Sequence, residues 1–193
     1  MKGLDARSPS WTVQVKGSAV TSRLRYLEEH APERREEIIA AMAVEHRAIL
    51  TAGVLKNAWV PYSLFIDLNV RLDEALGEGD LQLCRTMGAY GARVNLPTIY
   101  RLFYKVGTFG FILKRAARIW DIHYSSGKLF VESGDDWAKL RVEGFELPHR
   151  ALWLSVQGWA EASAELSGVV VKESTIIAAP EEPGEACEMR IRW

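Results

Sequence analysis

The chain has 193 residues, of which 48% are hydrophobic and 25% are charged, and its formal net charge at pH 7 is -1. This balance is typical of a folded globular protein, and it excludes a disordered chain and an overall electrostatic attraction to nucleic acid or anionic lipid. The length favours a single core, so the sequence predicts an arm over residues 1–17 and one domain over residues 18–193.

The first two thirds of the chain is predicted to be mostly helical. The alternating segment Trp11–Lys16 predicts a short strand, after which apolar residues recur at helical spacing. The clearest helix opens at Pro61, which suits a first turn, and closes at Gly77, which we expect in the left-handed conformation of a C-terminal cap. The other predicted helices are those that begin at Ser18, Pro32 and Asp80 and those that span 45–51, 97–107 and 109–122.

Beyond His123 the hydrophobic period changes from 3.6 to about 2, which is typical of strands. Alternating residues on both sides of the turn at 133–136 predict a hairpin, and a helix over 148–166 crosses to strands over 169–177 and 187–193. The predicted fold class is therefore α+β: an N-terminal helical layer packed on a C-terminal antiparallel sheet of about four strands, with one long crossover helix.

Cysteine usage and the length of the apolar runs indicate the compartment. Cys84 and Cys187 lie far apart in a chain without a charged-then-apolar signal segment, so a secreted disulfide framework is not expected. Charged residues interrupt every apolar run before it reaches the roughly 20 residues that span a bilayer. The sequence predicts a cytoplasmic protein with no membrane and no nucleic-acid partner.

Several segments combine spaced tryptophan, glycine and arginine residues in a pattern that resembles a known family. The chain is similar to uncharacterised proteins that are abundant as paralogues in myxobacteria and are distantly similar to the four-vinyl-reductase-type ligand-binding domain. The resemblance implies helices packed on an antiparallel sheet, a fold shared with a vesicle-tethering subunit, the sensor domains of aromatic-responsive transcription activators and a heme-based nitric-oxide sensor. It implies no activity. The segments that carry it are 59–62, 99–103, 114–120, 148–152, 156–159 and 186–193.

The resemblance also bears on metal binding. The aromatic-responsive sensors hold zinc with a set that includes two cysteines near the chain end, and Cys187-Glu188 matches the context of the later one. Ala178 and Ala179 stand where the earlier one is expected. Because a structural zinc site normally has four Cys or His ligands, we predict that Cys187 is an apolar core residue and that the chain holds no metal and no cofactor.

Aromatic side chains are the candidates for a ligand pocket. By analogy to the sensor relatives, a small apolar or aromatic ligand would lie between the helices and the sheet. Basic residues interleaved with aromatics over 99–124 fit amphipathic helices with solvated charges, or single-stranded nucleic acid, which the net charge disfavours. A third interpretation is an apolar pocket in which an Arg or Lys holds one anionic end of a ligand. His123 is open to two interpretations: a heme or metal ligand, or a helix-end histidine bonded to backbone carbonyls. The candidate ligand-binding residues are Tyr100, Phe103, Trp120, His123 and Trp159.

Small residues form a stripe along the crossover helix, at spacings of four, three and four: Ala151, Ser155, Gly158 and Ala162. Such a stripe lets another backbone approach closely. Its neighbour is predicted to be the sheet of the same chain or, alternatively, a ligand or a second subunit of a homodimer.

No nucleophile-elbow, P-loop or dinucleotide-binding motif occurs in the sequence, so no catalytic residue is nominated. The sequence therefore predicts a non-catalytic sensory or regulatory module, homodimeric, with a small apolar ligand and a protein as its candidate partners. The alternative is a protein–protein interaction scaffold without a ligand.

Overall fold

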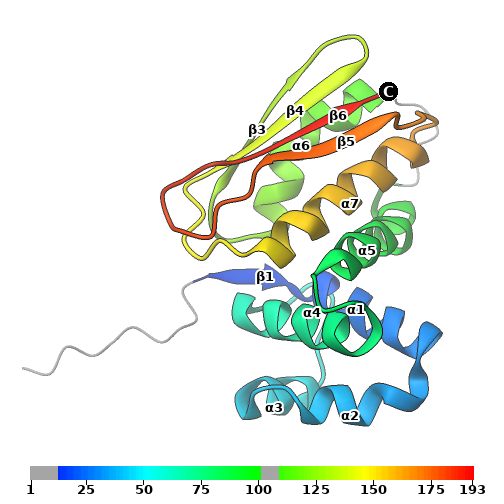
Figure 1. Ribbon diagram of the computed structural model, residues 1–193, viewed down its shortest axis with the longest axis vertical. Helices are drawn as coiled ribbons and strands as arrows, with labels where there is room; N and C mark the ends of the chain where they lie inside the picture. Colours follow the sequence, from blue (N-terminus) through cyan, green and yellow to red (C-terminus); the bar gives the residue numbers. More distant parts are fainter. Residues whose placement is uncertain (1–12, 101–108) are drawn as a thin grey trace, which may run out of the picture.

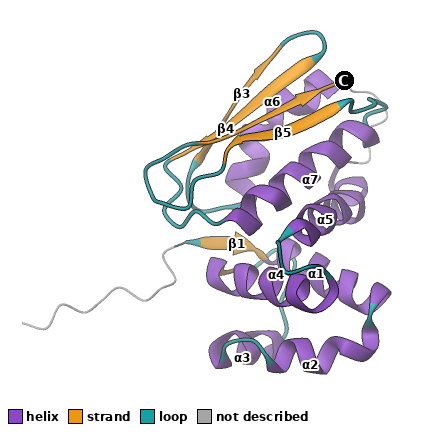
Figure 2. Cartoon of the chain, viewed as in Figure 1, coloured by secondary structure: helices purple, strands orange, loops and turns teal. Residues whose placement is uncertain are grey.

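The computed structural model describes residues 13–100 and 109–193, and it confirms the predicted α+β class. A four-stranded antiparallel sheet lies at one end of the molecule, and the helices are stacked away from one of its faces (Figures 1 and 2). The helices are α1 (Gly17–His30), α2 (Arg35–Ala40), α3 (Val44–Ala52), α4 (Tyr62–Leu76), α5 (Gln82–Tyr100), α6 (Phe109–His123) and α7 (Arg150–Leu166). The strands are β1 (Gln14–Lys16), β2 (Trp59–Pro61), β3 (Lys128–Ser133), β4 (Trp137–Glu143), β5 (Glu173–Ala178) and β6 (Cys187–Arg192).

The large sheet has the strand order β3-β4-β6-β5, and each neighbouring pair is antiparallel. The predicted hairpin is confirmed, with Leu129 opposite Val142 and Ser133 opposite Ala138. On β6, Cys187, Met189 and Ile191 are at most 2% exposed, because the period of two turns every second residue toward the helices. The helix α7 crosses from β4 to β5, so β6 enters the sheet between them as the last strand of the chain.

A second, two-stranded sheet joins the start of the described chain to its middle. β1 pairs with β2 in antiparallel register, with Val15 opposite Val60. Val13 and Val15 are fully buried, so this part of the predicted arm packs into the core. Residues 1–12 of the predicted arm lie outside the described residues.

The junction between α4 and α5 differs from the prediction. Gly77 is extended (φ -111°, ψ -153°) and not left-handed. Glycine is required there by close approach, because a Cβ would lie 2.9 Å from the Asp73 carbonyl oxygen and 2.9 Å from its carboxylate. The residues with positive φ at this junction are Gly79 (φ 77°) and Leu81 (φ 70°), and the Leu81 N–H donates to the Asp73 carboxylate.

Two other element boundaries predicted from the sequence are wrong. No new helix begins at Pro97, since α5 continues through it to Tyr100. Proline has no N–H, so Pro97 removes one backbone hydrogen bond of α5, but the helix continues through it. The third strand begins at Glu173, four residues later than predicted. Among the described residues, no helix has both the length and the apolar character needed to cross a bilayer.

Candidate functional site

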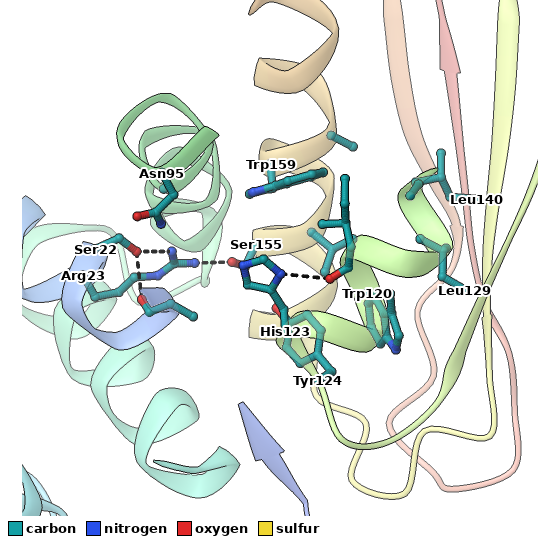
Figure 3. A pocket seen from close by; sticks show the side chains of 16 residues that line it. Ser22, Arg23, Asn95, Trp120, His123, Tyr124, Leu129, Leu140, Ser155 and Trp159 are labelled. Atoms are coloured by element: carbon teal, nitrogen blue, oxygen red, sulfur yellow. Dashed lines mark hydrogen bonds between the residues drawn. The ribbon is translucent and has the colours of Figure 1, made fainter. Parts of the chain in front are cut away.

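A cavity of about 80 Å³ lies where α1, α5, α6 and α7 meet strands β3 and β4 (Figure 3). Three of the predicted ligand-binding residues, Trp120, His123 and Trp159, line it together. The side chain of Tyr100 and all of Phe103 lie outside the described residues. The structure therefore brings together residues from the two helices, α6 and α7, that the sequence placed at a pocket.

The wall of the cavity on the sheet side is apolar. Trp120 is 3% exposed, donates its indole N–H to the Ser126 carbonyl oxygen at 3.0 Å and packs against Tyr124 with ring centroids 4.4 Å apart. Leu129 of β3 and Leu140 of β4 lie beyond it (Figure 3). In the described part of α6, buried apolar residues alternate with exposed Arg115 and Arg118 at helical spacing, which confirms the amphipathic interpretation of this segment.

His123 is the last residue of α6, and its ring nitrogen Nδ1 lies 2.9 Å from the Ile119 carbonyl oxygen. Because a carbonyl only accepts, Nδ1 carries the proton and Nε2 holds the lone pair of the neutral ring. This is the backbone hydrogen bond of the helix-end interpretation. Burial lowers the pKa of His123, which favours the neutral ring.

The lowered pKa of His123 predicts a pH dependence of stability. In the unfolded chain His123 has a pKa near 6.5 and takes up a proton more readily than it does in the folded protein. The stability that is present above pH 6.5 is therefore lost as the pH falls below that value. Burial also lowers the pKa of His149, whose Nδ1 accepts from the Ala151 N–H. We therefore expect His149→Asn protein to lose melting temperature between about pH 7 and pH 5, and His149→Asn/His123→Gln protein to lose less. Equal slopes for the two variants would contradict the assignment.

Arg23, which the sequence analysis did not single out, is the polar centre of the cavity. It is 3% exposed and is held by neutral partners only: Nε donates to Asn69 Oδ1 at 3.2 Å, Nη1 to Ser22 Oγ at 3.1 Å, and Nη2 to Ser155 Oγ. Burial lowers the pKa of Arg23 to about 10, so the guanidinium stays charged at neutral pH. The sequence carried one signal for the burial of Arg23. Arg23 lies three residues after the buried Val20, which places it on the inner face of α1.

The small-residue stripe of α7 packs against α5 of the same chain, and not against the sheet as predicted. A Cβ on Gly158 would lie 1.9 Å from the Arg85 carbonyl oxygen, and one on Gly88 would lie 2.0 Å from the Ser155 carbonyl oxygen. Each glycine thus admits the backbone of the other helix. Ala151, Ser155 and Ala162 are at most 4% exposed. The stripe is therefore covered within the chain and is not available to a second subunit.

A hydrogen-bonded Ser–His–Asp chain lies outside the cavity, on α3 and α4. His46 Nδ1 lies 2.7 Å from Asp67 Oδ2, and its Nε2 lies 3.0 Å from Ser63 Oγ. The order of partners is that of a hydrolase triad. Asp67 also accepts from the Ala43 N–H at 2.9 Å and pairs with Arg71. These contacts hold the start of α3 against α4, and that is the role the geometry supports.

The two cysteines are buried core residues with free thiols. Cys187 is 1% exposed, and burial raises its pKa to about 12, so it stays a neutral thiol. The prediction of Cys187 as an apolar core residue is confirmed. The described residues contain no group of three or more His, Cys, Asp or Glu side chains that could hold a metal ion.

Comparisons with known proteins identify the fold. No family model and no curated protein matches the chain. Solved structures do match, among them an H-NOX protein from K. algicida in the Fe(II) unliganded state (TM-score 0.70, 15% identity, 92% of this chain and 95% of that chain). Another is an H-NOX protein from S. oneidensis (TM-score 0.70, 11% identity, 92% and 95%). A third is an oxygen-binding H-NOX domain related to soluble guanylate cyclases (TM-score 0.61, 11% identity, 92% and 94%). The chain shares the H-NOX fold.

Because structures of this fold have been studied for the distortion of their heme, we tested whether the described residues fit a heme. His123 supplies a nitrogen lone pair at the cavity wall. The cavity volume of about 80 Å³, however, is far below the roughly 300–1,000 Å³ of pockets that hold drug-sized ligands. A heme needs a pocket at least as large as those that hold drug-sized ligands, so the cavity formed by the described residues does not fit a heme.

Proposed function

We propose that the protein is a cytoplasmic, non-catalytic sensory or regulatory module whose cavity binds a small ligand with an apolar body. The observation that carries this proposal is the cavity itself, an apolar space beside Trp120, Leu129 and Leu140 that contains one buried guanidinium. Protein interiors are close-packed and contain few voids larger than a water molecule, and a void in the core costs stability. A bound ligand gives such a void a role.

The shared fold and the sequence resemblance both support ligand binding. One solved structure of the same fold is an oxygen-binding domain. The segments that resemble the myxobacterial family and the four-vinyl-reductase-type domain point to a ligand-binding relative as well. His123 and Trp159 add to this support, because both were predicted from the sequence as ligand-binding residues and both line the cavity.

The volume of the cavity restricts the ligand to one smaller than an aromatic ring. An engineered apolar cavity of about 150 Å³ holds benzene. The cavity in this protein measures about 80 Å³. Of the apolar and aromatic ligands predicted from the sequence, we therefore propose an apolar ligand with fewer atoms than benzene.

The alternative function, a scaffold without a ligand, leaves the cavity empty or filled with water. It would also need a partner surface other than the small-residue stripe, because that stripe lies against α5. A homodimer remains a proposal, with its interface on another surface. Both questions are answered by counting subunits and bound mass in one experiment.

Native mass spectrometry of protein purified from its own cells tests the proposal. We expect a small mass that is retained in the native spectrum and lost on denaturation. Ala116→Leu fills the cavity from α6 and should abolish the retained mass, whereas Ala117→Leu adds the same side chain at the exposed neighbouring position and should preserve it. If the native mass per subunit equals the denatured mass of wild-type protein, the proposal is overturned in favour of the scaffold.

A further inference from the structure

The buried charge at one end of the cavity indicates which ligand it selects. Arg23 lies on α1 and reaches between α5 and α7, with its guanidinium carbon 5.1 Å from the centroid of the Phe65 ring (Figure 3). Burying a charge is unfavourable unless it is paired. Among the described residues, no carboxylate lies within ion-pair distance of Arg23, and all of its hydrogen-bond partners are neutral. The charge is solvated by dipoles and has no counterion within the described chain.

Two N–H donors of the Arg23 guanidinium are not used by its three hydrogen bonds. It has five N–H groups, and the three hydrogen bonds to Asn69, Ser22 and Ser155 use one on each nitrogen. Nη1 and Nη2 therefore each retain one N–H. Two donors on a planar cation that lines a cavity match a carboxylate, which accepts from arginine through both of its oxygens.

The neighbouring helix α5 has a glycine where it passes the Arg23 guanidinium, and this leaves space for the cation. Gly91 of α5 is buried, and a Cβ there would lie 2.9 Å from Arg23 Nη1 and 3.3 Å from Ser22 Oγ. A glycine inside a helix costs about 1 kcal/mol relative to alanine, so this position favours space for the cation over helix stability. The polar end of the cavity is thus formed by α1, α5 and α7 together.

The opposite end of the cavity has no comparable polar group. Leu129, Leu140 and Trp120 lie on the sheet side, on the far side of the cavity from Arg23 (Figure 3). A ligand that satisfies both ends carries an anionic head and a short apolar tail. With about 80 Å³ available, the tail is an alkyl chain of about two carbons.

We propose that the cavity binds a short-chain monocarboxylate of the size of propionate, with its carboxylate on Arg23 and its alkyl group toward Leu129 and Leu140. The inference rests on the proposed ligand-binding function and names the ligand class for that site. The buried cation gains a counterion when the ligand binds, and the void is filled at the same time. Binding should therefore stabilise the fold.

The test compares propionate with propionamide, its neutral analogue of nearly equal shape, by calorimetry and by melting temperature at constant ionic strength. We expect propionate to bind and to raise the melting temperature, and propionamide to bind at least tenfold more weakly. Arg23→Gln removes the charge and should weaken propionate binding at least tenfold. Arg25→Gln removes the same charge from an exposed site two residues further along α1 and should leave binding unchanged.

The outcomes separate this inference from the proposed function. Equal binding of propionate and propionamide would overturn the carboxylate assignment and leave an apolar ligand site. If sodium chloride raises the melting temperature as much as propionate does, the effect is a nonspecific effect of anions, and the carboxylate assignment is also overturned. If neither compound binds and wild-type protein retains no mass, both proposals fail. If Arg23→Gln protein does not fold, the comparison of the two compounds on wild-type protein still decides.

Discussion

Gly158→Ala is expected to destabilise the protein by about 3 kcal/mol, the upper end for overpacking, and so to lower the melting temperature by about 6–12 °C. The added Cβ would lie 1.9 Å from the Arg85 carbonyl oxygen and 3.1 Å from the Ala89 nitrogen. Both are backbone atoms of α5, so no side chain can rotate away. The two helices must separate, and the core on both sides of them is disturbed.

The direction of the stability change distinguishes close packing at Gly158 from an open helix surface. In an open helix, glycine to alanine stabilises by about 0.5–1 kcal/mol, because alanine has the higher helix propensity. Gly88→Ala, the reciprocal change on α5, should destabilise to a similar extent, since its Cβ would lie 2.0 Å from the Ser155 carbonyl oxygen. A melting temperature that is raised by Gly158→Ala, measured by calorimetry, would rule out the close crossing of α5 and α7.

Asp73→Ala is expected to lower stability by about 3 kcal/mol, because it removes a fully buried carboxylate that two backbone donors share. Asp73 accepts from the Leu81 N–H at 2.8 Å and from the Leu83 N–H at 2.9 Å. Hydrogen bonds to a charged group contribute about 1.5–3 kcal/mol each, and the variant leaves both donors without a partner at the start of α5. Denaturant unfolding measures the loss.

Asp80 provides the matched control for this prediction. Its side chain accepts from the Gln82 N–H at 2.9 Å at the start of the same helix, but it is exposed, so water replaces it readily. Asp80→Ala should cost only about 0.5–1 kcal/mol, the lower part of the range for N-caps. An Asp73→Ala loss no larger than that of Asp80→Ala would show that Asp73 does not organise the α4–α5 junction.

Local patterns were sufficient to predict the order of strands and helix in the last third of the chain, although β5 begins four residues later than predicted. The period of two placed Cys187, Met189 and Ile191 on the inner face of β6, and the turn at 133–136 predicted the hairpin of β3 and β4. The strand pattern follows from the sequence because it depends on residues that are close together in the chain. Trp120, His123 and Trp159, which the fold brings to one cavity, were nominated with the help of the resemblance to sensor domains.

The sequence by itself determined which residues of β6 and of the α7 stripe turn away from water, and the tertiary structure decided what they are buried against. Gly158 was predicted to admit a neighbour, but only the packing shows that the neighbour is α5. Arg23 became the centre of the site because Asn69 and Ser155, which are 46 and 132 residues away in the sequence, converge on its guanidinium. Periodicity reports the side of a helix that avoids water. It carries no information about a cavity, whose walls come from elements that meet only in the fold.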